Sequence, residues 1–309
     1  GKDLVGTDRT TKDVIVCALE EGMEIKVSKE GENIPYSFGE KLQDEGTYVI
    51  RITDSLGNVK SFTIVIDRSV DASISAMDGA ITNDDVDIDA FEEVEVTVTK
   101  DGEAYSYEQG QDLTEEGHYR VVLKDKLGNV KEYDFCIVKS PKKSVDYELG
   151  DGVEIIEVKK GGELIPHEGN GLDFEEDGTY EVTVNKDGKT QTFTIVLDNT
   201  APTIGLEGVE DGGSVDGKVT ISSMSEEGTM VVKKDGVVID YKLGDELSEY
   251  GHYEITVTDL LGNSRTYSFD LAFRMNGWSI ALIVVASLTL VGGVAAVIAN
   301  RKRIFKKRK

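Results

Sequence analysis

The sequence contains few of the residues that usually build catalytic centres. Among its 309 residues are three histidines, two cysteines and one tryptophan. It has no Gly-x-Ser-x-Gly, His-Glu-x-x-His or phosphate-cradling glycine motif, which would place a nucleophile, a metal or a phosphate. We therefore expect a protein that is not an enzyme and that carries no organic cofactor.

Positive charge is also scarce in most of the chain. All 59 acidic residues precede Arg274, together with 26 of the 34 basic ones, so this part has a net charge of −33. A surface of this sign repels phosphate backbones and anionic membranes. We expect no nucleic-acid partner and a chain that stands away from anionic surfaces.

What the sequence does contain is a signature repeated four times. A Leu or Phe is followed by an acidic residue, a Gly and a Tyr at every second position. The glycines are 71, 61 and 73 residues apart, which indicates an array of one structural unit. The signatures are Leu42-x-Asp44-x-Gly46-x-Tyr48, Leu113-x-Glu115-x-Gly117-x-Tyr119, Phe174-x-Glu176-x-Gly178-x-Tyr180 and Leu247-x-Glu249-x-Gly251-x-Tyr253.

Apolar residues alternate with polar ones on both sides of each signature. Tyr119, Val121 and Leu123 show the pattern after the tyrosine, and Phe135 and Ile137 show it on the return. Alternation of this kind predicts strands with one buried face. Three units reach an Asp-x-Leu-Gly-Asn turn between these strands, where we expect Gly and Asn to supply the positive φ of a tight hairpin.

A tyrosine that follows acidic-x-Gly at the start of a strand matches the tyrosine corner of Greek-key sandwiches. With the Asp-x-x-Gly-Asn turn, the Phe-x-Ile strand and the Asp198-Asn-Thr-Ala-Pro202 junction, the chain resembles tandem bacterial immunoglobulin-like (Big-type) repeats of Gram-positive surface proteins. The resemblance implies an all-β fold of antiparallel immunoglobulin-like sandwiches, with Tyr48, Tyr119, Tyr180 and Tyr253 as structural corners. The predicted segments are repeats at 1–67 (lacking its first strand), 68–139, 140–198 (shortened) and 199–273, a transmembrane helix at 277–299 and a basic cytoplasmic tail at 300–309.

The cysteines and histidines do not fit a site within these repeats. Cys17 and Cys136 fall in different units, which argues against a disulfide inside one unit. His118 and His252 share one repeat position, where the alternation places them on the solvent face. His167 lies in a loop after Pro166. We expect all three histidines to be isolated surface residues.

Calcium is the one metal that the composition suggests, because acidic extracellular repeats supply the oxygen ligands that it prefers. The densest acidic stretch contains Asp84, Asp85 and Asp87. Val86 and Ile88 alternate with these carboxylates, as in a strand with one solvated face. We expect no high-affinity calcium site, and these three aspartates are the candidates if one exists.

One uncharged run of 22 residues, from Trp278 to Ala299, is long enough to cross a bilayer. Seven of the nine residues that follow Asn300 are basic, and the positive-inside rule places that tail in the cytoplasm. The tail is too short to fold. We therefore expect a single-pass protein that contacts the lipid bilayer through 277–299, with its repeats outside the cell.

These features together predict a membrane-anchored stalk or adhesin-type surface protein, in which the repeats act as spacers and as binding modules for a protein or glycan ligand. The chain begins with Gly1 and its first unit lacks a leading strand, so we expect it to be the membrane-proximal piece of a longer protein. The alternative is the stem of an extracellular enzyme whose catalytic domain lies upstream. These residues do not separate the two readings.

Overall fold

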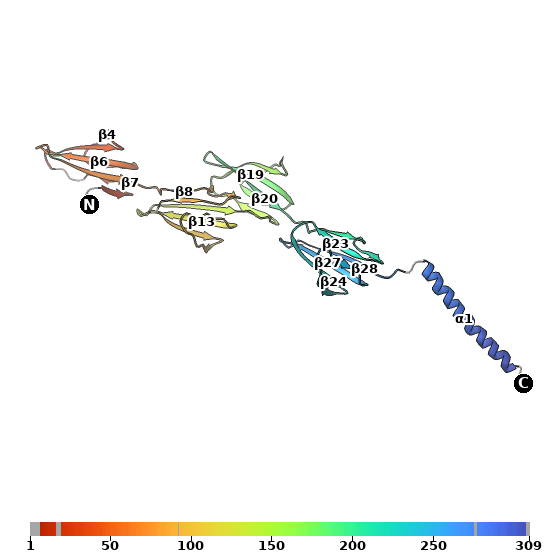
Figure 1. Cartoon of the computed structure of the whole chain (residues 1–309). Coiled ribbons are helices and arrows are strands. Elements are labelled where there is room, and N and C mark those ends of the chain that lie inside the picture. Colours follow the sequence, from red (N-terminus) through yellow and green to blue (C-terminus); the bar gives the residue numbers. More distant parts are fainter. Residues whose placement is uncertain (1–6, 17–19, 92, 275–276, 307–309) are drawn as a thin grey trace. The chain divides into compact units, whose positions relative to one another are not determined.

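In the computed structural model, every described secondary-structure element is a β-strand except one helix at the C-terminal end of the sequence (Figure 1). The chain forms two compact units, residues 1–198 and 199–309. Its strands fall into four sets with a common order, called here the first (β1 to β7), second (β8 to β14), third (β15 to β20) and fourth (β21 to β28) repeats. The structure describes residues 7–16, 20–91, 93–274 and 277–306.

The first unit holds three of these repeats. The first repeat pairs a five-stranded sheet, β1-β7-β6-β3-β4, with the two strands β2 and β5. The second pairs β12-β11-β13-β14-β9 with β10 and β8, and the third pairs β17-β16-β19-β20 with β15 and β18. The strands are β1 (Thr7–Thr10), β2 (Val14–Ile15), β3 (Glu24–Lys29), β4 (Glu32–Ile34), β5 (Lys41–Leu42), β6 (Gly46–Thr53), β7 (Val59–Ile66), β8 (Ala72–Ile74), β9 (Ile81–Thr82), β10 (Ile88–Ala90), β11 (Glu95–Lys100), β12 (Glu103–Ala104), β13 (Gly117–Lys124), β14 (Val130–Ile137), β15 (Val145–Glu148), β16 (Glu154–Lys160), β17 (Glu163–Leu164), β18 (Gly171–Phe174), β19 (Gly178–Lys186) and β20 (Lys189–Leu197).

The second unit holds the fourth repeat and the helix. Its sheets are β22-β28-β27-β24-β25 and β21-β23-β26. The elements are β21 (Ile204–Glu207), β22 (Gly213–Val215), β23 (Val219–Met224), β24 (Gly228–Lys234), β25 (Val237–Ile239), β26 (Glu246–Leu247), β27 (Gly251–Asp259), β28 (Ser264–Leu271) and α1 (Gly277–Lys306).

Each repeat buries the apolar face that the alternation predicts. In the second repeat, Tyr119 of β13 lies opposite Phe135 of β14, and neither side chain is exposed. The buried residues form four clusters, one centred in each repeat, and the cluster of the third repeat also includes Ala80 and Ile81 of the second. The predicted fold class, tandem immunoglobulin-like β-sandwiches followed by one apolar helix, is confirmed. The division of the chain at residues 67, 139 and 198 stays a prediction.

The sandwiches are not wholly antiparallel, although antiparallel sheets were predicted. β1 runs parallel to β7, β9 to β14 and β22 to β28. The reason is visible in the second repeat, where β8 pairs with β10 in one sheet and the chain then crosses to the other sheet as β9. β9 therefore lies at the edge of the larger sheet, next to β14, and runs in the same direction as β14.

The Asp-x-Leu-Gly-Asn turns differ from the prediction in one respect. Gly57, Gly128 and Gly262 have φ between 82° and 88°, as expected, but none of the three asparagines has a positive φ. In the first repeat, Asn58 donates its backbone and side-chain amides to the two carboxylate oxygens of Asp54, both at 2.8 Å. The asparagine therefore closes the turn by hydrogen bonding, so it needs no left-handed backbone.

The helix α1 extends further than predicted. Its segment Ile280–Ile298 has a mean hydropathy of 2.6, and it is long and apolar enough to cross a membrane. The helix continues to Lys306, through most of the tail that was predicted not to fold. Arg and Lys have favourable helix propensities, so the basic run does not end the helix.

Candidate functional site

The four signature tyrosines lie near the starts of the long central strands, with rings at most 3 % exposed. Each hydroxyl donates a hydrogen bond to the backbone carbonyl four residues earlier, at 2.9 to 3.0 Å. This bond joins the turn before the strand to the core below it. The acceptors are Asp44 for Tyr48, Glu115 for Tyr119, Glu176 for Tyr180 and Glu249 for Tyr253.

The signature glycine lets a lysine cross this corner. A Cβ at Gly117, whose φ is 149°, would lie 2.6 Å from Cε of Lys100. Lys100 reaches over the glycine and donates to Glu115 at 2.5 Å, and this hydrogen bond raises the pKa of the lysine. The third and fourth repeats have the same pair, Lys160 with Glu176 and Lys234 with Glu249. In these three repeats the lysine and the acidic residue of the corner are therefore paired with each other.

Two of the three histidines have a carboxylate partner, contrary to the expectation that all three are isolated. His118 Nε2 lies 2.6 Å from Asp134 Oδ1, and His252 Nδ1 lies 2.8 Å from Asp270 Oδ1. The hydrogen bond to Asp270 raises the pKa of His252. His167 is part-buried, and its Nε2 has no hydrogen-bond partner in the described part of the chain. Among the described residues, no serine hydroxyl or cysteine thiol bonds to an imidazole, so these pairs lack a nucleophile.

The calcium candidates do not converge. The Asp85 carboxylate accepts a hydrogen bond from Lys139, and the Asp87 amide donates to Ser75 Oγ at 2.9 Å. Within the described ranges, no group of three or more close carboxylates includes Asp84, Asp85 or Asp87. The alternation with buried Val86 and Ile88 spreads their side chains along a solvated face.

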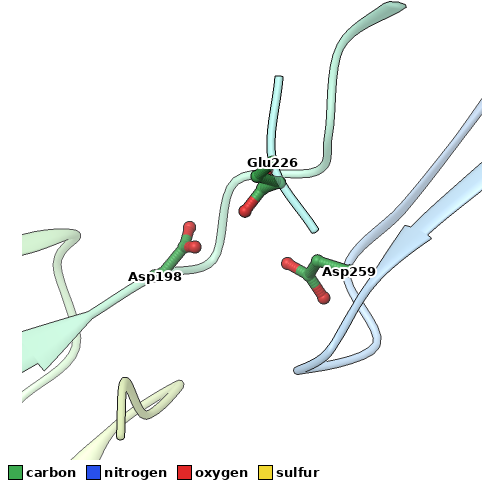
Figure 2. Close-up of side chains that lie close together, drawn as sticks. All are labelled: Asp198, Glu226 and Asp259. Atoms are coloured by element: carbon green, nitrogen blue, oxygen red, sulfur yellow. The ribbon is translucent and has the colours of Figure 1, made fainter. Parts of the chain in front are cut away.

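In the second unit, the side chains of Glu226 and Asp259 approach each other, with one oxygen of each within 4.8 Å (Figure 2). Figure 2 also labels Asp198, the last residue of the first unit. Asp259 is 9 % exposed, and its carboxylate accepts hydrogen bonds from the backbone and side chain of Asn263 at 2.7 and 2.8 Å. Burial acts to raise the pKa of Asp259, but these bonds outweigh it and lower the pKa. The Asp259 carboxylate is thus already engaged by its own turn.

The segment between the second and third repeats is held by one carboxylate. Glu116 accepts hydrogen bonds from the backbone amides of Lys139 and Ser140, from Ser140 Oγ at 2.6 Å and from Lys142 Nζ at 3.0 Å. Burial acts to raise the pKa of Glu116, yet these donors lower it to about 2. The connection therefore has little freedom where it leaves β14.

A second set of contacts joins β9 of the second repeat to β20 of the third. The Asn83 side chain acts as a peptide group: its Oδ1 accepts from Thr194 N at 2.6 Å, and its Nδ2 donates to Thr194 O at 2.8 Å and to Val138 O at 2.7 Å. Nearby, Gln191 Nε2 donates to Ile81 O at 2.7 Å. Side-chain amides thus replace a backbone ladder between two strands of different repeats.

Two glycines bring the backbones together at the same junction. Gly150 N donates to Gly79 O at 2.8 Å, and a Cβ at Gly150 would lie 2.6 Å from Gly79 Cα. Asp78, beside Gly79, accepts hydrogen bonds from Lys186 Nζ at 2.8 and 3.0 Å through its carboxylate and its carbonyl. The close approach of the Gly79 and Gly150 backbones leaves no room for a side chain at position 150.

A cleft of about 640 Å³ opens beside the junction. Its charged lining includes Asp78, Asp85 and Lys186, which already form ion pairs within the protein. Asp84 and Asp187 also line it, and their carboxylates have no hydrogen-bond or ion-pair partner among the described residues. None of these carboxylates belongs to a group of three or more close His, Cys, Asp or Glu side chains in the described part of the chain.

Comparison with known proteins gives no family assignment: no family model matches the chain, and no curated protein matches it. Solved structures with tandem immunoglobulin domains do match. The N-terminal four Ig domains of Dscam1 isoform 6.9 are 12 % identical over 89 % of this chain and 98 % of that one, with a TM-score of 0.26. The insect immune protein hemolin is 15 % identical over 87 % and 98 %, with a TM-score of 0.25. The titin I-band fragment I67–I69 is 8 % identical over 66 % and 99 %, with a TM-score of 0.27.

Proposed function

We propose that this chain is a membrane-anchored extracellular stalk or adhesin-type protein of the Gram-positive surface type, with its repeats outside the cell and its basic end inside. The observation that carries the proposal is the succession of immunoglobulin-like repeats and one apolar helix followed by a basic run. A helix of that length and hydropathy suits a bilayer, and the basic residues favour the cytoplasmic side.

The contacts of the described residues favour a spacer role. The tyrosine hydroxyl of each corner bonds within its own repeat, and the Glu116 carboxylate restrains the segment between the second and third repeats. The large net negative charge of the first 273 residues adds repulsion from anionic wall polymers within about a Debye length. Restrained joints and like-charge repulsion both serve to hold a distal part of a protein away from the surface.

Protease treatment of intact cells tests the orientation. Cells expressing the chain with an epitope after Lys309 should lose the repeats to external protease and keep a short membrane-bound fragment with the epitope. Loss of the epitope with survival of the repeats would contradict the orientation. Release of the untreated chain by alkaline carbonate would contradict the membrane anchor.

Binding by the repeats is a separate question with its own measurement. Beads coated with residues 1–273 should be tested against matrix proteins, glycans and cell walls. Saturable binding that is lost on deletion of one repeat supports an adhesin. Absence of binding to every one of these supports the spacer role alone.

A further inference from the structure

The third repeat lacks an element that completes the large sheet of the other three. β1, β9 and β22 each run parallel to the last strand of their own repeat. In the third repeat, this pairing is reduced to a single bridge between Lys142 and Leu197. The edge of β20 towards its N-terminal half is therefore left without a strand from its own repeat.

The second repeat covers that edge. Asn83 bonds both backbone groups of Thr194, and the backbone groups of Val196 and of Asp198, just after β20, bond to Lys142, so Thr194 and Val196 of β20 both face this side. The segment from Asp78 to Asn83 lies alongside, contacting Lys186 at the end of β19 and then Gln191 and Thr194 of β20. β9 thus pairs with β14 by backbone hydrogen bonds and with β20 by side-chain amides.

The core of the third repeat also includes residues of the second. Ala80 and Ile81 are 1 % and 2 % exposed and belong to the same buried cluster as Val182, Val184 and Ile195. Met77, Cys136 and Val138 of the second repeat pack against that cluster. Removing the second repeat would open the core of the third to water along one side.

We infer that β9 is a shared strand and that the second and third repeats form one cooperative folding unit, in which the third repeat depends on the second. The edge of β20 is an interaction surface, and the partner that it fits is the segment Asp78 to Asn83 of the same chain. The joint between these two repeats consequently does not bend as a linker would. This inference stands apart from the proposed function, because it concerns only contacts within the first unit.

Hydrogen exchange of the full chain in detergent micelles, read by mass spectrometry, tests the inference. Val184→Ala removes buried methyl groups from the third repeat, where Val184 is 0 % exposed. Exchange should accelerate by about tenfold or more in β16, β19 and β20, and by a similar factor in β13 and β14 of the second repeat. Acceleration confined to the third repeat would overturn the inference.

A matched control occupies the same place in the fourth repeat. Val257 is also 0 % exposed and, like Val184, is four residues after its signature tyrosine. Val257→Ala should accelerate exchange in β24, β27 and β28 and leave β13 and β14 unchanged. An effect of Val257→Ala on β13 would mean that exchange does not resolve separate folding units, and the inference would fail on that result as well.

A second variant tests the amide bridge without opening a cavity. Asn83→Asp keeps the size of the side chain but replaces the donor to Val138 O and Thr194 O with a carboxylate oxygen, so it should accelerate exchange in both repeats. Asn58→Asp is the same substitution in an exposed turn, where the side-chain amide of Asn58 bonds only to Asp54 of that turn. It should affect β6 and β7 alone. Equal exchange of Asn83→Asp and the unmodified chain across both repeats would contradict a shared strand.

Discussion

The hydroxyl and the ring of Tyr119 are expected to contribute separately to stability, by amounts that follow from the corner geometry. The hydroxyl makes one hydrogen bond, to Glu115 O at 3.0 Å. The ring is fully buried, stacked on Phe135 with centroids 5.6 Å apart and edge-on to Tyr105 at 5.7 Å. Tyr119→Phe removes only the hydrogen bond, which is worth about 1 kcal/mol.

Tyr119→Ala also empties the site of the ring. Truncation of a buried aromatic side chain costs about 3 to 5 kcal/mol, because the surrounding core collapses only in part. Because about 1.4 kcal/mol corresponds to a tenfold change in an equilibrium constant, the slowest amides of β13 should exchange about fivefold faster in Tyr119→Phe. In Tyr119→Ala the acceleration should exceed about a hundredfold.

Tyr133 provides the control in the neighbouring strand. Its ring lies under Lys131, 5.2 Å from Nζ, and its hydroxyl has no hydrogen-bond partner among the described residues. Tyr133→Phe should therefore change the free energy of unfolding by no more than about 0.5 kcal/mol. If Tyr119→Ala left the exchange of β13 unchanged, or if Tyr119→Phe were as damaging as Tyr119→Ala, the corner would not have the role assigned to it.

Three further perturbations have expected outcomes. Gly150→Ala places a Cβ 2.6 Å from Gly79 Cα and should lower the thermal midpoint of the first unit. Gly217→Ala lies in the second unit, and because its Cβ meets only Val215 at 3.9 Å it should leave the midpoint of that unit unchanged. An unchanged midpoint of the first unit in Gly150→Ala would contradict the close packing. Because the pKa of Glu116 falls from 4.5 to about 2 on folding, its stabilisation is present above pH 4.5 and is lost as pH falls towards 2. Urea titrations should accordingly show Glu116→Gln less stable than the unmodified chain at pH 6 and equal to it near pH 2. Folding raises the pKa of His252, so the sign of the pH dependence is opposite to that of Glu116. The stabilisation by the charged imidazole is full below pH 6.5 and is lost as pH rises through the folded pKa. The difference in melting temperature between the unmodified chain and His252→Gln should therefore shrink on going from pH 5.5 to pH 8.5.

The alternation and the signature determined the repeats because both depend on local geometry. Side chains alternate across a strand whatever surrounds it, so Tyr119, Val121 and Leu123 identify the buried face without knowledge of the neighbours. A tight hairpin also restricts its residues locally, which made the glycines of the turns predictable. The uncharged run of α1 is likewise a property of consecutive residues.

The partners of polar side chains were not predictable in the same way. Asp134 and Asp270 have no local signature, and they meet His118 and His252 only because β14 and β28 fold back in a particular register. The turn asparagines were assigned a positive φ on residue type alone. A hydrogen bond from Asn58 to Asp54 gives the same turn with an ordinary backbone.

The sequence by itself determined that this chain is an acidic array of four small sandwiches followed by an apolar helix. Only the tertiary structure decided that the second and third repeats share β9. That junction depends on the contact of Asn83 with Thr194, 111 residues later in the sequence, and on the contact of Gly79 with Gly150. Both pairs are far apart in the sequence. Alternation and turn preference act over a few neighbouring residues, whereas contacts between repeats depend on the packing of two folded surfaces, which no local pattern encodes.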